Sequence, residues 1–381
     1  MKFLHLSDLH LGKRLIDMSL LEDQEHILDE IVRVAKEEEV QAVLISGDIY
    51  DRSNPASEAM ALFSRFVHRL KQLGCLVLVI SGNHDSSERV AYFGELVCDS
   101  GVFLSPVYNG HISPVETSDD YGVVAFYLMP YIHPEVVRRF FPDEKCENAN
   151  DAAALVLGEI HPNPAHRNVI LSHQLIFGSE FDEREQRSVG TLDNVDAALY
   201  EAFDYVALGH IHKAQNVGRP DGTMRYCGTP MKYSKKEALS EKSVTVVELR
   251  EKGDISVRTV PLTPLREMRL VRGSFDEVIE CGPEPGTEGD YFFITLTDDE
   301  DILHAASRLR ERFGRVLDVD FDNARTRSDS ELTIDGIPDI EQKSPLELIM
   351  ELYRLTHSTD MSDEARAFTE KMIRETEGFE G

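Results

Sequence analysis

Five short, mostly apolar runs in the first 212 residues each end in a polar residue that can bind a metal ion. Short runs of this kind predict buried β-strands. The runs are Phe3–Leu6, Ala42–Ile45, Leu76–Ile80, Val169–Leu171 and Tyr205–Leu208. The polar residues after them are aspartate, asparagine or histidine. Because ligands bind beyond the carboxyl ends of strands in α/β folds, the pattern predicts one site at a common sheet edge.

Between the first three strands the apolar spacing becomes that of amphipathic helices. Residues 21–38 place Leu28 and Ile31 on one face, and residues 57–73 form a second such helix that ends at Gly74. The resulting β-α-β-α-β order predicts a largely parallel, doubly wound sheet.

The middle of the chain is less regular. We expect strands at 123–128 and 225–227, a hairpin of 244–249 with 255–260, and a short helix at 151–159. We expect loops at 116–120, 160–166 and 178–193. The last of these is long and polar, and a loop of its size beside a site is typically functional.

Pro261 and Pro264 mark a boundary between the main domain and the C-terminal part of the chain. Beyond it we expect a small α+β unit with strands at 267–272, 291–296 and 316–321 and a helix at 302–313. A polar linker then leads to a capping box that begins at Ser344 and opens a helical tail. The expected divisions are 1–264, 265–322, 323–343 and 344–381.

Composition places the chain among globular proteins. Its 381 residues suggest two or three domains, with 41% hydrophobic and 29% charged residues. Apolar runs fall short of the ~18 residues of a membrane helix, so we expect a cytoplasmic protein with no membrane contact. Five scattered cysteines without a C-x-x-C pair argue against a disulfide framework and against structural zinc.

The net charge of -29 argues against strong unaided binding of DNA. It does not exclude a nuclease, because a metal-dependent nuclease needs carboxylates to bind its metals and a partner protein can provide the binding to DNA.

Seven residues at the strand ends are candidate metal ligands. They are Asp8, His10, Asp48, Asn83, His173, His210 and His212. Oxygen and imidazole ligands without thiolate suit Mn2+, Fe2+ or Zn2+. Two divalent metals that share Asp48 would use the whole set. Asp8, His10 and either His210 or His212 would complete the ligands of one metal. Asn83, His173 and the other of these two histidines would complete those of the second metal. Paired metals of this kind hydrolyse phosphate esters.

The blocks Asp8-x-His10, Gly47-Asp48-x-x-Asp51, Gly82-Asn83-His84-Asp85, His173 and Gly209-His210-x-His212 resemble, in order, the signature of the calcineurin-like metallophosphoesterases. The resemblance implies an αββα sandwich with a small α+β cap and a helical tail. It assigns Asp8, His10, Asp48 and His212 to one metal. It assigns Asp48, Asn83, His173 and His210 to the other.

The same resemblance makes His84 a catalytic histidine that is not a ligand, oriented by Asp85. Arg14, Arg52 and Arg89 closely follow ligand blocks and are candidates for contacts with phosphate. The remaining histidines lack such a context, and we expect them to be structural.

Met1–Gly12 and the Tyr226–Ser234 segment are similar to the branch of this family formed by SbcD-type nuclease subunits. This similarity implies a manganese-dependent 3′–5′ double-strand exonuclease and single-strand endonuclease. It would act with an SbcC-type coiled-coil ATPase, in a heterotetramer, in DNA end processing, hairpin cleavage, replication, repair and recombination. A homodimer through the nuclease domain and a DNA-binding role for the cap are further expectations.

The apolar stripe of the tail is the expected site for the ATPase partner. It consists of Leu346, Ile349, Met350, Tyr353, Phe368 and Met372. Two other functions stay open: a phosphodiesterase for cyclic nucleotides or phosphoproteins, and a non-catalytic scaffold of a DNA-associated ATPase.

Overall fold

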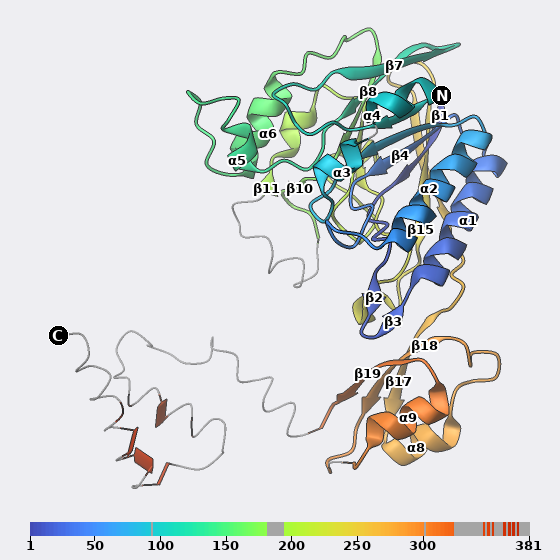
Figure 1. Cartoon of the computed structure of the whole chain (residues 1–381), viewed down its shortest axis with the longest axis vertical. Coiled ribbons are helices and arrows are strands. Elements are labelled where there is room, and N and C mark those ends of the chain that lie inside the picture. The colour runs from blue at the N-terminus through green and yellow to red at the C-terminus, as the bar shows by residue number, and fades with distance from the viewer. Residues whose placement is uncertain are drawn as a thin grey trace. The chain divides into compact units, whose positions relative to one another are not determined.

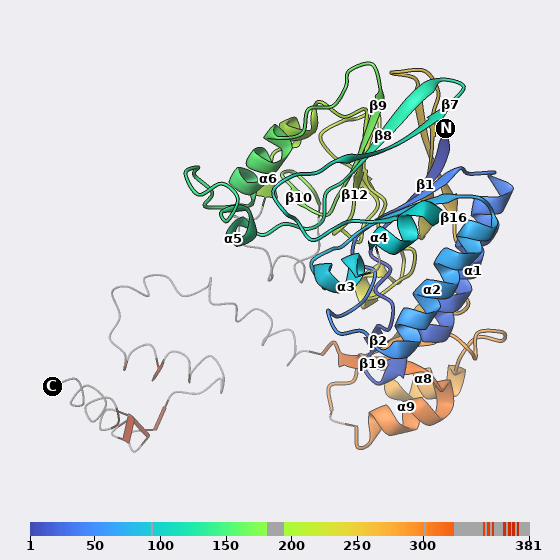
Figure 2. The ribbon, with the colours of Figure 1, turned by 45° about the horizontal axis from the view of Figure 1, so that its top comes forward.

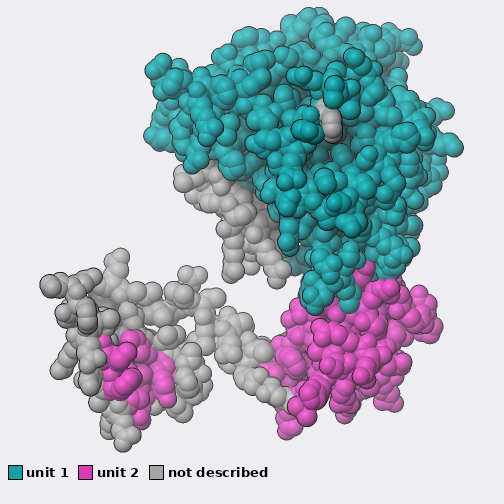
Figure 3. Space-filling model, in the orientation of Figure 1, with its two compact units in different colours: residues 1–268 teal, residues 269–381 magenta. Residues whose placement is uncertain are grey.

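The computed structural model describes residues 1–92, 94–180, 194–300 and 302–323, and isolated positions between 346 and 372. The chain divides into two compact units, Met1–Met268 and Arg269–Gly381 (Figure 3). Each unit has its own apolar core.

A six-stranded sheet forms the first half of the Met1–Met268 unit, in the order β16-β15-β1-β4-β5-β6. Four of its strands are parallel: β1 (Lys2–Leu6), β4 (Ala42–Ser46), β5 (Leu76–Ile80) and β6 (Val102–Leu104). The hairpin of β15 (Ser243–Leu249) and β16 (Ile255–Pro261) adds antiparallel to β1. The predicted β-α-β-α-β start and the predicted hairpin are both confirmed.

A second six-stranded sheet has the order β13-β14-β12-β9-β8-β7. Its parallel strands are β8 (Gly122–Leu128), β9 (Arg167–Ser172), β12 (Tyr205–Leu208) and β14 (Met224–Tyr226). The antiparallel edges are β7 (Pro114–Asp119) and β13 (Gln215–Asn216). The alternation in β7, whose side chains are exposed and half-buried in turn, is that of an edge strand.

The two sheets pack face to face over a shared apolar core. Phe3 and Leu44 from the first sheet and Phe126, Leu171 and Tyr205 from the second are almost fully buried in it. Phe3 meets the rings of Phe126 and Tyr205 edge to face, with centroids 6.1 and 5.6 Å apart. Replacing one such buried phenylalanine by alanine typically costs about 3–5 kcal/mol.

Helices cover the outer faces of the sandwich, as Figures 1 and 2 show. On the first sheet lie α1 (Leu21–Glu37) and α2 (Ser57–Gln72), and on the second lie α5 (Pro134–Val137) and α6 (Ala149–Gly158). Helix α1 carries Glu22 and Asp23 in its first turn, where carboxylates favour the helix dipole. Gly74, with φ of +82°, follows α2 as the sequence predicts. The αββα order is therefore confirmed.

Shorter elements connect these layers. They are β2 (Arg14–Leu15), β3 (Met18–Ser19), α3 (Ser87–Ala91), α4 (Gly94–Val97), η1 (Cys98–Ser100), β10 (Leu175–Ile176), β11 (Asn194–Val195), η3 (Ala197–Tyr200) and η4 (Lys235–Glu237).

The Arg269–Gly381 unit contains a small α+β fold. A three-stranded sheet has the order β17-β18-β19, from β17 (Met268–Gly273), β18 (Tyr291–Leu296) and β19 (Val316–Phe321). Helices α8 (Phe275–Cys281) and α9 (Ala305–Phe313) contribute Phe275 and Leu309 to its core.

The structure differs from the sequence analysis in one expectation and adds one helix that the sequence analysis misses. Residues 116–120, expected as a loop, lie largely in β7, because an edge strand tolerates polar side chains on its open side. Helix α8 had not been predicted, although Ser274 and Glu277 form a capping box at its start.

Three expectations fall outside the described residues: most of the 178–193 loop, nearly all of the 323–343 linker and most of the 344–381 tail. Among the helices that the structure describes, none is long and apolar enough to cross a membrane.

Candidate metal centre

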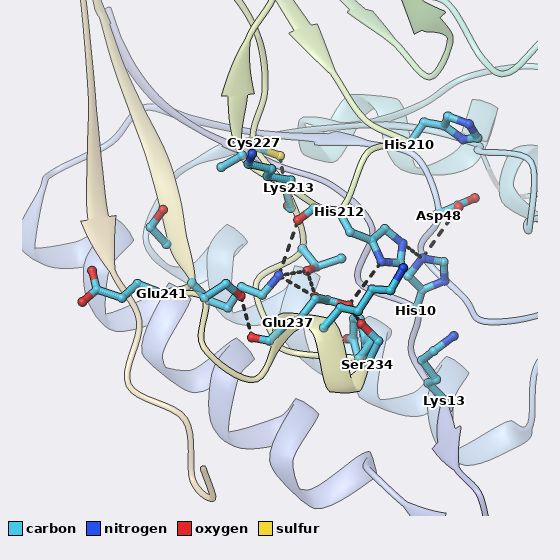
Figure 4. A pocket seen from close by; sticks show the side chains of 18 of the residues that line it. His10, Lys13, Asp48, His210, His212, Lys213, Cys227, Ser234, Glu237 and Glu241 are labelled. Carbon is cyan, nitrogen blue, oxygen red and sulfur yellow. Dashed lines mark hydrogen bonds and ion pairs between the residues drawn. The ribbon is translucent and has the colours of Figure 1, made fainter. Parts of the chain in front are cut away.

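The carboxyl ends of the parallel strands of both sheets meet at one edge of the sandwich, and the seven candidate ligands lie there. Asp8 and His10 follow β1, Asp48 follows β4 and Asn83 follows β5. On the second sheet His173 follows β9, and His210 and His212 follow β12. Figure 4 shows His10, Asp48, His210 and His212 among the side chains that line a cleft. The sequence prediction of one shared edge is confirmed.

One half of the cluster consists of Asp8, His10 and His212, whose ligand atoms lie within 4.8 Å of one another. Asp8 and His10 are buried, and the Nε2 atoms of His10 and His212 are 3.1 Å apart. Asp8 accepts the backbone N–H of His210 at 3.1 Å and a bond from the Ser7 hydroxyl.

The other half gathers around Asp48 and Asn83. The Nε2 of His173 lies 3.4 Å from Asp48 Oδ2 and 3.1 Å from Asn83 Oδ1. Asn83 Oδ1 also lies 3.0 Å from His210 Nδ1. Asp48 Oδ2 lies 3.8 Å from His10 Nε2, so this carboxylate faces both halves. The position is the one that a bridging carboxylate needs.

Four of these residues have left-handed backbone: Asp8, His10, Asp48 and His210 have φ of 53°, 43°, 49° and 100°. Such conformations are uncommon outside glycine and concentrate at functional sites. The strand ends also approach each other closely. A Cβ on Gly47 would overlap the ring of His173. The sequence therefore needs glycine directly before Asp48.

The donor set fits divalent metal ions. The buried carboxylates and imidazoles face one another, and the Nδ1 of His10 is buried without a hydrogen bond among the described residues. Burial, followed by the charge of His173, lowers the pKa of His210 to about 3 and so favours the neutral, ligating form. Burial opposes a charge on His173, but Asp48 outweighs it and raises that pKa to about 9. Metal cations bound between the carboxylates and the imidazoles would take the place of the protons on these histidines.

His84 lies beside the cluster and is exposed. Its backbone N–H donates to Asp48 Oδ1 at 2.9 Å, and its ring meets that of His10 edge to face at 4.9 Å. The expected pair between His84 and Asp85 is not formed. Instead, the Nδ1 of His84 lies 3.0 Å from the carbonyl oxygen of Asp51.

Asp85 braces the backbone of two ligand loops instead. Its carboxylate accepts the N–H groups of Ile49, Tyr50 and Gly82 at 2.9–3.0 Å. Burial, followed by the charge of Asp48, raises the pKa of Asp85 to about 6. The residue holds together the loops that carry Asp48 and Asn83, which is a different role from the one expected.

The three candidate arginines are not among the described residues that line the cleft. The side chain of Arg52 is 82% exposed, and Arg14 donates to the carbonyl of Asp17. Arg89 lies in α3 and is exposed. The cationic side chains in the wall of the cleft are lysines instead: Lys13, Lys213, Lys236 and Lys242.

The cleft has a volume of about 910 Å³ and includes residues that sequence reasoning missed. Tyr233 is buried, its hydroxyl donates to the carbonyl of Leu9 at 2.5 Å, and its ring lies 5.7 Å from that of His10. Glu237 lies beside His212. Tyr233 lies within the Tyr226–Ser234 segment and Glu237 lies three residues beyond it, so only that segment's resemblance could have indicated them.

The six apolar candidates of the tail all lie at described positions with helical backbone. Phe368 and Met372 expose 65% and 52% of their surface. The role of these side chains in partner binding stays a prediction.

Two family models match the chain. One, described as calcineurin-like phosphoesterase, matches residues 1–214. The other, described as type 5 capsule protein repressor C-terminal domain, matches residues 264–357.

A curated relative is the D subunit of the nuclease SbcCD of Staphylococcus epidermidis. It is 28% identical over 339 residues, which cover 87% of this chain and 89% of that protein. Two solved structures share less of their sequence with the chain. A structure titled GAP50, the anchor in the inner membrane complex of Plasmodium, has a TM-score of 0.43 and 13% identity over 84% of this chain and 96% of its own. A dimetal phosphatase from Danio rerio has a TM-score of 0.40 and 12% identity over 70% and 98%.

Proposed function

The chain belongs to the calcineurin-like phosphoesterase family, and from this premise we propose that it is a two-metal DNA nuclease. The observation that carries the proposal is the convergence of side chains from five strand ends, with Asp48 between oxygen and imidazole donors. The likeness to the nuclease subunit of Staphylococcus epidermidis extends over 87% of the chain and supports DNA as the substrate.

Asp8, His10, Asp48 and His212 would hold one metal, and Asp48, Asn83, His173 and His210 the other. When bound, two divalent metals neutralise the phosphate oxygens and supply a hydroxide nucleophile at neutral pH. Manganese is the proposed native ion, and the ligand set also suits iron or zinc.

His84 would donate the proton that the leaving 3′ oxygen needs. The carbonyl oxygen of Asp51 can only accept a hydrogen bond, so the Nδ1 of His84 carries a hydrogen. Its Nε2 is thereby the atom that can exchange a proton with substrate. The exposed position of His84 at the mouth of the cluster allows that contact.

The net charge of -29 makes a partner part of the proposal. A chain this acidic is repelled by DNA phosphates, so an SbcC-type coiled-coil ATPase would supply most of the grip in a cytoplasmic heterotetramer. Residues 265–322 would act as the DNA-binding cap, and the 344–381 tail would bind the ATPase.

The test is hydrolysis by the metal-stripped chain after Mn2+ is restored. We expect degradation of an end-labelled linear duplex and of a single strand, and no reaction in excess EDTA. A cyclic nucleotide and a phosphopeptide are assayed beside the DNA. Intact DNA with hydrolysis of either small substrate would contradict the nuclease proposal, and inertness toward all three would favour a scaffold.

A further inference from the structure

Glu237 is the last residue of η4, and its carboxylate lies behind the ring of His212. The Oε1 of Glu237 is 3.7 Å from His212 Nδ1, slightly longer than a hydrogen bond, and Figure 4 shows the two side chains pointing toward each other. On the opposite side of the ring, His212 Nε2 faces His10 Nε2. The imidazole is therefore placed between a carboxylate and the metal cluster.

The carboxylate itself is held firmly. Its side chain is 15% exposed, and its Oε2 accepts from Lys242 Nζ at 2.6 Å and from the Thr229 hydroxyl at 3.2 Å. Its Oε1 accepts from the Ser234 hydroxyl at 2.8 Å. Lys242 Nζ also lies 3.4 Å from the carbonyl oxygen of His212, so the same lysine anchors both residues.

A carboxylate on one ring nitrogen selects the tautomer that carries its hydrogen there and leaves the other nitrogen free to bind a cation. Resting on the metal centre proposed above, we propose that Glu237 is a positioning residue. It orients His212, fixes hydrogen on Nδ1 and so strengthens the metal position that His212 shares with Asp8 and His10.

Within the described part of the chain, two of the other candidate histidines, His173 and His10, have no such carboxylate in hydrogen-bonded support behind the ring. His173 Nδ1 lies 2.6 Å from the carbonyl oxygen of Ser46, which is a backbone support. His10 Nδ1 lies 4.0 Å from the nearest Asp51 oxygen and has no hydrogen bond among the described residues. Losing Glu237 should therefore weaken one of the two metal positions and spare the position that includes His173.

The experiment is a Mn2+ titration of the metal-stripped full chain by calorimetry, with no DNA present. We expect two sites in the unaltered protein. In Glu237→Gln we expect one site weakened about 10–100-fold, the usual range for a residue that supports a ligand in this way. The matched control is Glu241→Gln, which removes an exposed carboxylate from the wall of the same cleft and should leave both affinities unchanged.

A double-mutant cycle distinguishes the proposed positioning role of Glu237 from a purely structural role. In His212→Ala, adding Glu237→Gln should change Mn2+ affinity no further, because the carboxylate acts through the missing ring. Glu237→Gln combined with Lys242→Gln removes both charges of this ion pair, so no charged side chain is left there without its partner. This double variant provides a folded protein with the same expected loss if the single variant is unstable.

Two unchanged sites in Glu237→Gln, or an equal loss in Glu241→Gln, would overturn the role of Glu237 alone. Additive losses in the His212→Ala background would also overturn it. Absence of Mn2+ binding by the unaltered chain would overturn both this inference and the proposed function.

Discussion

Neighbouring residues in the Gly82–Asp85 loop have sharply different surroundings. Asn83 Oδ1 points at two histidines of the cluster, His84 is exposed beside it, and Asp85 is turned back toward backbone N–H groups. Three consecutive side chains thus have three different surroundings, and substitutions can test the separate roles proposed for them.

Comparison of His84→Ala with Asp48→Ala tests the division between catalysis and metal binding. We expect His84→Ala to lose nuclease turnover by about 10²–10⁴-fold, the usual share of general acid catalysis, and to keep two metals. Asp48→Ala should disturb both metals, since its carboxylate faces both halves of the cluster.

The metal content of His84→Ala and Asp48→Ala is measured by mass spectrometry after gel filtration. His84 lies within 4.8 Å, by ligand atoms, of His10 and Asp48. Loss of one metal equivalent in His84→Ala would therefore identify it as a ligand and contradict the proposed role.

Asp85→Asn tests the brace between the two ligand loops. An amide cannot accept three N–H bonds as a carboxylate does, so we expect a loss of about 1–3 kcal/mol in the free energy of unfolding of the metal-free chain. Urea unfolding measures the change. Glu88→Gln, an exposed site on the following helix, should stay within about 0.5 kcal/mol of the unaltered protein. Equal stability of the two variants would mean that the brace is unimportant.

The positions of the ligands were predictable at the scale of single residues. Each candidate ligand lies within four residues of the end of an apolar strand, so the strand ends bring the seven together. Glu237 and the contact of His84 with Asp51 depend on how loops from distant parts of the chain pack, and no local pattern encodes them. The interaction of Asp85 was misjudged for the same reason.

Among the elements, the two sheets are joined at one end by Arg167 of β9. Its guanidinium donates to Asp119 of β7 at 3.1 Å and to the carbonyl oxygens of Leu249 and Arg250 at 3.2 and 2.9 Å. Leu249 ends β15, so one buried side chain connects both sheets.

Asp119→Asn should therefore destabilise the sandwich by about 3–5 kcal/mol, because it leaves Arg167 buried without its counter-charge. Burial opposes ionisation of Asp119, but hydrogen bonds from Arg167 hold its pKa well below the usual range. A lowered carboxyl pKa stabilises the fold above the unfolded value near 4, and this contribution is lost as pH falls below it.

The measurement is thermal unfolding of the metal-free protein between pH 7 and pH 3. The unaltered chain should lose stability more steeply below pH 4 than Asp119→Asn. Parallel pH profiles of the two proteins would show that the pair contributes no pH-dependent stability.

Elements with a clear period were predictable, and those without one were not. Helices α1 and α2 and the buried strands follow their apolar spacing closely. Strand β7 has few apolar residues because one side of it is open, and α8 spans only Phe275–Cys281, too short for a helical period to stand out. Apolar periodicity arises where one face of an element is buried. Elements that are weakly buried therefore lack a periodic pattern from which they could be predicted.

At the scale of the whole molecule, the proposed division of labour is between a metal-binding unit and a tail that recruits the ATPase. Isolated helices as short as those expected in 344–381 are marginal in water, so their apolar stripe needs a covering surface. A helix laid on a coiled coil would supply it.

Deletion of residues 344–381 should leave Mn2+-dependent cleavage of single strands within about twofold of the full chain, since every candidate ligand precedes the deletion. It should abolish co-purification with an SbcC-type ATPase. A pull-down with full and truncated chains makes the comparison. Equal recovery of the ATPase would place the interface elsewhere, and Leu346→Asp with Phe368→Asp in the full chain provides a second test.

The position of β1 between β4 and β15 has a consequence for how the protein is made. The first ligands belong to the start of the chain, but the strand that completes the sheet beside them ends only at Leu249. At about 5–20 residues per second, tens of seconds of translation separate the two. Until then the open side of β1 lacks its partner, and the ligands that follow β9 and β12 arrive late. We therefore expect a nascent chain to lack the proposed metal centre until its synthesis has passed His212, the last candidate ligand, and Leu249, the end of β15.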